Sequence, residues 1–256
     1  MFGRQLLIVV LGLIVVLSLS VGCDGSANIA EDPNPDSQRV VLVELFTYSG
    51  EKPCEQAGQA LEELADGYGP SKLLLLEYYL SEGLSTVEGF NRFVDYNLEY
   101  EVPAVCFNGR VNAVNQWESY EEYKARADSE RAKDTPIVIT AEKSFSDNKI
   151  VVDANVYNAG KSLLSGFEML FVAYEDTGHL NRRNLVRDIE SGPSMFDSLS
   201  AGESAPFNIT FDIPDCDTSK IEVVVFLQST SPETREVLQA TLAISNEDGA
   251  LATSGV

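Results

Sequence analysis

The first half of the chain alternates short apolar runs with segments in which apolar residues recur every three or four positions. Residues 39–48 (RVVLVELFTY) and 71–80 (SKLLLLEYYL) are runs typical of buried strands. Between them, residues 53–68 show the spacing of a helix that ends at two glycines. The elements that follow are predicted to be a helix, a hairpin and a helix, over residues 85–98, 102–115 and 117–133.

This order of strand, helix, strand, helix, hairpin and helix predicts a layered α/β domain over residues 39–133. The dipeptide Asn108-Gly109 is a frequent hairpin turn, so we expect the chain to reverse there.

The pattern changes at Thr135-Pro136, after which short runs alternate apolar and polar residues between turn-forming residues. Such strands predict an antiparallel β-sandwich of immunoglobulin-like type over residues 136–245. The expected fold class is therefore α/β plus all-β. The last residues, 246–256, lack apolar periodicity and are expected to be a disordered tail.

The N-terminus has the pattern of a secretory signal peptide, with Arg4 before an apolar run that ends in small residues. Gly22-Cys23 is similar to the end of a bacterial lipobox, although Ser20 stands where that motif usually has leucine. We expect a signal peptide over residues 1–22 and a lipid-anchored tether over 23–38, with Cys23 as the lipidated residue. An uncleaved helical anchor and ordinary cleavage remain alternatives, and all three place the folded part outside the cytoplasm.

Composition narrows the classes of partner and chemistry. The formal net charge of −22, from 40 acidic and 18 basic residues, disfavours nucleic acid as a partner. With a single histidine, His179, the chain has no histidine-rich zinc site, and we expect neither a metal nor a cofactor. Lipidation of Cys23 would leave Cys54, Cys106 and Cys216, which allow at most one disulfide.

The stretch VELFTYSGEKPC, residues 43–54, resembles the strand, loop and helix of secreted thioredoxin-like proteins, whose pattern is roughly V-E-L-F-T-S-x-G-C-x-x-C. The later segment YEVPAVCFNG resembles the part of that family in which a Val-Pro bond is cis and faces the active site. In this chain Cys54 matches the second cysteine of the motif, and Glu51 replaces the first. Because glutamate cannot exchange disulfides, the family's dithiol cycle does not carry over.

Three interpretations of Cys54 remain open. It is a buried relic that packs as a small apolar residue, a monothiol activated by the helix N-terminus, or half of a disulfide with Cys106. By the same resemblance, Glu44 matches an acidic residue that lies beneath the cysteines, where it would act as the base for Cys54. The alternative is that Glu44 is an edge or partly solvated carboxylate.

The resemblance also implies a groove that accepts an extended peptide. Its residues would be Gly50, Glu51, Lys52, Pro53, Cys54, Val102 and Pro103. We therefore expect a membrane-anchored binding or structural module of the cell envelope that has lost dithiol activity, with an extended peptide or another envelope protein as its partner. The alternative is a thiol-disulfide oxidoreductase that uses Cys54 alone or together with Cys106.

Overall fold

The computed structural model describes residues 38–81, 83–98, 101–146, 149–178, 183–192, 198–213 and 217–246. Its first half has the predicted order of elements. These are β1 (Val41–Thr47), α1 (Lys52–Tyr68), β2 (Leu73–Tyr79), α2 (Val87–Tyr96), β3 (Ala104–Phe107), a short 3-10 turn (Arg110–Asn112), β4 (Ala113–Val114) and α3 (Tyr120–Arg131).

The hairpin between β3 and β4 differs from the prediction at its turn. The strands pair antiparallel, Val105 opposite Val114, but the connection includes a 3-10 turn and is longer than two residues. Gly109 has a φ of 105°, and a Cβ there would lie 2.1 Å from the carbonyl oxygen of Arg235. The glycine is therefore required by its close packing against the second half of the chain rather than by a tight turn.

The second half consists of strands, as the alternating pattern predicts. The longer ones are β5 (Ile137–Ser146), β6 (Lys149–Asn158), β8 (Phe167–Asp176), β9 (Asn184–Ser191), β11 (Ser204–Asp212), β12 (Ile221–Ser229) and β13 (Val237–Leu242). Three two-residue strands, β7 (Leu164–Ser165), β10 (Ser198–Leu199) and β14 (Ile244–Ser245), and a 3-10 turn (Thr218–Lys220) complete the described elements.

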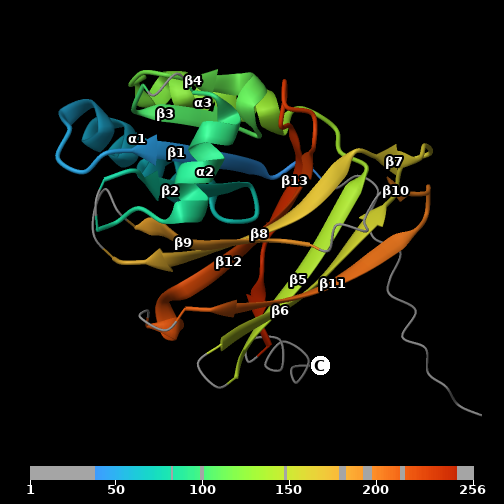
Figure 1. Ribbon diagram of the computed structural model, residues 1–256. Coiled ribbons are helices and arrows are strands. Elements are labelled where there is room, and N and C mark those ends of the chain that lie inside the picture. Colours follow the sequence, from blue (N-terminus) through green and yellow to red (C-terminus); the bar gives the residue numbers. More distant parts are fainter. Residues whose placement is uncertain are drawn as a thin grey trace, which may run out of the picture. The chain divides into compact units, whose positions relative to one another are not determined.

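One sheet runs through both halves of the chain. Its strand order is β13-β12-β8-β9-β2-β1-β3-β4, so strands of the second half continue from β2 of the first (Figure 1). The junction is narrow, because the parallel register between β2 and β9 consists of the single pair Glu77 and Leu185. A four-stranded sheet, β11-β6-β5-β14, packs over β8 and β12 through a shared apolar cluster that includes Val152, Phe171 and Val225.

The predicted boundary near Thr135-Pro136 falls between α3 and β5, but all described residues belong to one compact unit, Pro33–Val256. Two domains over residues 39–133 and 136–245 therefore stay a prediction, as does the immunoglobulin-like arrangement of the second half. The signal peptide, the tether apart from Gln38, and the tail apart from Asn246 lie outside the described residues.

The two faces of the central sheet bury different helices. Because side chains alternate along a strand, Val43 and Leu45 of β1 pack in a cluster with α1 and α3. Leu42 and Phe46 point the other way and pack in a cluster with α2 and with strands β8 and β12. This alternation decides which residues of the predicted site can meet.

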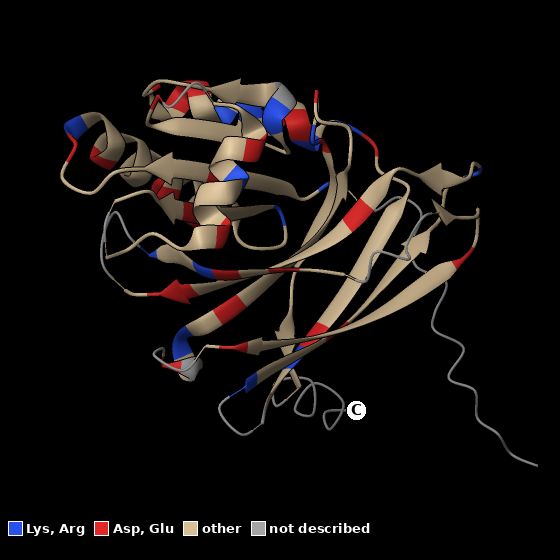
Figure 2. Cartoon of the chain, in the orientation of Figure 1, with Lys and Arg blue, Asp and Glu red and all other residues tan. Residues whose placement is uncertain are grey.

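Charged residues of both signs are spread over helices and strands, with acidic positions in excess (Figure 2). None of the helices in the described part of the chain has the length and apolar character needed to span a bilayer.

Candidate functional site at the end of the central sheet

Three loops of the first half meet at one end of the central sheet. Phe46 pairs with Ala104, and Val105 pairs with Val114. The residues that follow β1, precede β3 and follow β4 are therefore neighbours at this sheet end. The loops carry residues 48–51, 102–103 and 115–119, and we refer to them together as the sheet-end site.

The first loop is exposed up to the start of α1. Gly50 adopts a φ of 84°, and Glu51 is the N-cap of α1 with an extended backbone and no capping hydrogen bond from its side chain. Lys52 and Pro53 open the first turn and are also exposed. The side chain at the position of the family's first cysteine is thus a solvated carboxylate near the positive end of the helix dipole.

Cys54 is buried, with 3% of its surface exposed, and its thiol is free. The backbone N–H of Tyr48 donates a hydrogen bond to its Sγ over 3.5 Å. The side chain is thus held in place at the start of the helix, with little surface available to a disulfide substrate.

Of the three interpretations of Cys54, a disulfide with Cys106 does not hold in this structure, in which both are free thiols. The physical reason is strand alternation. Cys106 and Ala104 belong to the cluster on the α2 face, whereas α1, which carries Cys54, packs on the face of Val105. Burial, reinforced by the nearby Glu44 carboxylate, holds the pKa of the Cys106 thiol well above its usual range.

Glu44 is neither a base beneath Cys54 nor a partly solvated carboxylate, so both predictions for it are wrong. It lies on the α2 face of β1, fully buried. Arg92 donates to both of its carboxylate oxygens, from Nε over 2.5 Å and from Nη2 over 3.0 Å. The hydroxyls of Tyr78 and Tyr96 donate to it over 2.9 and 2.6 Å.

This buried network also joins the two halves of the chain. Arg92 donates from Nη1 to Gln228 Oε1 of β12 over 3.1 Å, and Gln228 Nε2 donates to the Tyr96 hydroxyl over 2.8 Å. Both carboxylate oxygens of Glu44 accept hydrogen bonds. Glu44 and Arg92 therefore form a structural ion pair, and Glu44 is not placed to transfer protons.

The second loop contains the Val102–Pro103 bond, which is cis. Val102 is half-buried and Pro103 is buried. Two exposed aromatic side chains that sequence reasoning did not select also belong to the sheet-end site: Tyr48 is 40% exposed and Trp117 is 44% exposed. The sequence gave no separate signal for them, because Tyr48 ended a run predicted as a strand and Trp117 began a segment predicted as a helix.

The remaining candidates fall elsewhere. Cys23, Cys216 and His179 lie outside the described residues. Among the residues that the structure describes, no group of three or more histidine, cysteine, aspartate or glutamate side chains is placed to hold a metal ion.

Comparisons with known proteins support the thioredoxin-like fold. No family model and no curated protein matches the chain. Among solved structures, HBP35 of Porphyromonas gingivalis matches with a TM-score of 0.66 at 12% identity, covering 82% of this chain and 77% of that one. A domain of the outer membrane lipoprotein Omp28 from Porphyromonas gingivalis matches with a TM-score of 0.33 at 15% identity, covering 44% and 89%. The first likeness shows a shared thioredoxin-like and β-rich fold and, at this identity, the fold alone.

Proposed function

We propose that this chain is an extracytoplasmic, membrane-anchored protein that binds an extended polypeptide at the sheet-end site without dithiol exchange. The observation that carries the proposal is the state of the thiols. Glu51 occupies the exposed position of the first cysteine, Cys54 is buried, and Cys106 lies on the opposite face of the sheet. No pair of described cysteines is thus arranged to cycle between dithiol and disulfide.

Binding is supported by the side chains that the sheet-end site exposes. Tyr48 and Trp117 present aromatic surface, and Glu51 and Lys52 add charges of both signs. Exposed aromatic residues beside polar ones are typical of interfaces, because aromatic rings supply contact area with few rotatable bonds. An extended segment would contact all three loops, which end at neighbouring strands.

The anchor and the location rest on the N-terminal sequence. The basic residue, apolar run and Gly22-Cys23 pair favour export and lipidation at Cys23. In cells fed a labelled fatty acid, we expect the chain to carry the label and the Cys23→Ser variant to lose it. Label retained by the variant would contradict an anchor at Cys23.

Binding is tested with a display library of 12-residue peptides selected on the full chain. The Tyr48→Ala/Trp117→Ala variant is expected to lose at least about tenfold in affinity for the selected peptides, as for the removal of interface anchors. Its stability should change by less than about 0.5 kcal/mol per site, because both side chains are exposed. Phe145→Ala, an exposed aromatic on β5, is the matched control. Equal peptide affinity in all three proteins would contradict the proposed site.

The loss of dithiol chemistry is tested by restoring the missing cysteine. Glu51→Cys recreates C-x-x-C at the start of α1, so we expect an internal disulfide between positions 51 and 54 and measurable reduction of a disulfide substrate. Lys52→Cys places a thiol in the first turn of α1 without the C-x-x-C spacing and serves as the control. If the Glu51→Cys variant gains no thiol-disulfide exchange activity, the loss of one cysteine does not explain the absence of dithiol chemistry in this chain.

A monothiol oxidoreductase is the second candidate, favoured by the position of Cys54 in the first turn of α1 and by the Tyr48 N–H directed at its sulfur. It requires substrate to reach a side chain that is 3% exposed, which is why we place it second.

A further inference from the structure

Helix α2 has apolar residues on two sides, and only one of them packs into a core cluster. Phe93 and Tyr96 are buried in the cluster that the helix shares with the central sheet. Val87, Phe90 and Val94 lie on the solvent side, where they are 70%, 45% and 43% exposed. A helix that only covers a sheet carries polar residues on its outer side, so the second apolar side of α2 is left open to solvent in the described part of the chain.

The exposed residues of α2 form a stripe, because positions three and seven residues apart lie in line along a helix. We refer to Val87, Phe90 and Val94 as the α2 stripe. Figure 1 shows the helix crossing in front of β1 and β2. Single exposed apolar residues are common on protein surfaces, whereas contiguous ones with a polar rim mark interaction surfaces.

The rim of the α2 stripe is acidic. Glu88 and Asp95 are exposed on the helix itself. On the neighbouring strand β9, burial raises the pKa of Asp188, and the Glu88 carboxylate adds to the rise. Burial and the charges of Asp188 and Glu88 likewise raise the pKa of Glu190. These carboxylates therefore lie close enough to repel one another.

No described cation neutralises this rim. None of its carboxylates forms an ion pair with a described residue. The guanidinium of Arg92 is taken up by Glu44, and Arg110, at the end of the helix, donates from Nε to the carbonyl oxygen of Tyr96 over 2.5 Å.

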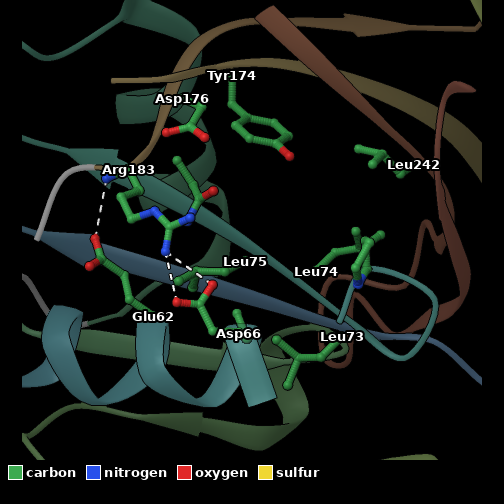
Figure 3. Close-up of a pocket in the computed structure, with 12 residues that line it drawn as sticks. Glu62, Asp66, Leu73, Leu74, Leu75, Tyr174, Asp176, Arg183 and Leu242 are labelled. Carbon is green, nitrogen blue, oxygen red and sulfur yellow. Dashed lines mark hydrogen bonds and ion pairs between the residues drawn. The ribbon is translucent and has the colours of Figure 1, made fainter. Parts of the chain in front are cut away.

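Carboxylates on the α1 face differ in this respect. In the pocket of about 200 Å³ that α1, β2 and β9 help to line, Arg183 Nη1 donates to both oxygens of Asp66, over 3.0 and 2.8 Å (Figure 3). That carboxylate is paired within the chain, whereas those beside the α2 stripe require a cation from outside it.

The charge of the rim decides between the possible occupants of the α2 stripe. A second copy would bring two acidic rims together, and juxtaposed like charges disfavour association. The segments next to the described residues, 24–37 and 247–256, contain acidic but no basic residues, so they are no better matched. An anionic lipid surface is repelled for the same reason.

We propose that the α2 stripe binds a cationic amphipathic helix of a partner protein. Its apolar residues would pack on Val87, Phe90 and Val94, and its lysines or arginines would lie beside the acidic rim. Helices pack through residues three and four positions apart, and ten residues of α2 offer about 15 Å of length, which matches about three turns of a partner helix. This surface is separate from the loops of the sheet-end site.

The proposal is tested by fluorescence anisotropy with a labelled 14-residue peptide of leucine and lysine, whose leucines are three and four positions apart. We expect saturable binding to the full chain that weakens with added salt. A scrambled peptide of the same composition, and one with glutamate in place of every lysine, should bind at least about tenfold more weakly. No saturation, or equal binding of the scrambled peptide, would overturn the proposal.

Variants locate the binding surface. Phe90→Ala/Val94→Ala removes exposed side chains only and should weaken binding of the leucine-lysine peptide by at least about tenfold. Trp117→Ala, an equally exposed aromatic of the sheet-end site, is the matched control and should bind as the unaltered chain does. Loss of binding in Trp117→Ala, with none in the α2 variant, would overturn the proposal and leave the function proposed above intact.

Charge reversal tests the acidic rim. Glu88→Lys/Glu190→Lys should reverse the preference, so that the glutamate peptide binds more tightly than the lysine peptide. Glu203→Lys/Asp217→Lys changes the net charge equally at exposed positions elsewhere and should keep the original preference. An unchanged preference in the first variant would contradict the role of the rim.

The same α2 variant distinguishes the other occupants. Sedimentation equilibrium should show no association of the unaltered chain that Phe90→Ala/Val94→Ala abolishes. A dimer lost in this variant would assign the stripe to a second copy, and binding to phosphatidylcholine vesicles lost in it would assign the stripe to a bilayer. Either result would overturn the proposal.

Discussion

Each face of the central sheet buries a carboxyl group, and the two groups differ in their hydrogen-bond partners. Glu44 on β1 and Glu77 on β2 sit one register step apart, since Glu44 pairs with Leu76 and Leu45 pairs with Glu77. Both are fully buried. Glu44, on the α2 face, has an arginine and two tyrosine hydroxyls on its oxygens, whereas Glu77, on the α1 face, has one backbone N–H.

Their partners determine what each group does. Burial, together with the nearby Glu62 carboxylate, raises the pKa of Glu77 to about 8, against the smaller opposing effects of the Asn184 N–H and of Arg183. Glu77 therefore holds its proton at neutral pH, while Glu44 forms an ion pair that connects α2 to β12. On the α2 face both oxygens of Glu44 accept hydrogen bonds, whereas on the α1 face Glu77 Oε1 has no hydrogen-bond partner among the described residues.

The largest effect is expected from breaking the ion pair on the α2 face. Arg92→Leu leaves Glu44 buried without its cation and should lower the free energy of unfolding by about 3–5 kcal/mol. Arg126 also donates two hydrogen bonds to one carboxylate, that of Glu118, but this pair is partly exposed. Arg126→Leu should therefore lower the free energy of unfolding by about 1 kcal/mol or less. Chemical denaturation of both variants measures the difference, and equal losses would show that burial of the pair contributes nothing.

A smaller effect is expected from Glu77, and it depends on pH. Because the folded chain keeps a proton that the unfolded chain releases above about 4.5, the contribution of Glu77 to stability is full below that pH and is lost as pH rises through about 8. Each pH unit in this window corresponds to about 1.4 kcal/mol. Glu77→Gln cannot ionise, so its stability relative to the unaltered chain should rise by up to about 3 kcal/mol between pH 5.5 and 7.5.

The measurement is a set of urea unfolding curves for both proteins across that range. Glu203→Gln, which removes an exposed carboxylate in the second half, is the control for a change in net charge. Parallel stability profiles for Glu77→Gln and the unaltered chain would contradict the assignment of a proton to Glu77.

Much of the fold could be predicted from the sequence, because its elements have strong periodicity. The helices and strands of the first half follow the apolar pattern, and so do the long strands of the second. Strand β9 could not be foreseen, because Arg187 and Asp188 interrupt its apolar residues. This strand places the second half next to β2, so the single continuous sheet could not be foreseen either.

The candidate site was predicted less well, for a related reason. The resemblance to thioredoxin-like proteins implied a common groove for Cys54, Glu51 and the Val102–Pro103 segment, and the strand registers bring these segments to one sheet end. The face on which a side chain lies depends on strand phase, and a shift of one residue exchanges the faces. Glu44 and Cys106 were thus assigned to Cys54, although both belong to the α2 face, and Glu77 on the α1 face was overlooked.

The most direct test of the account is the alkylation of each cysteine in the full chain, followed by mass spectrometry under native conditions and in denaturant. We expect Cys54 and Cys106 to react slowly in the folded chain, rapidly in denaturant, and to form no bond with each other under oxidising conditions. Rapid native alkylation of Cys54, or an internal disulfide between Cys54 and Cys106, would contradict a binding site without thiol chemistry and make the oxidoreductase the better description.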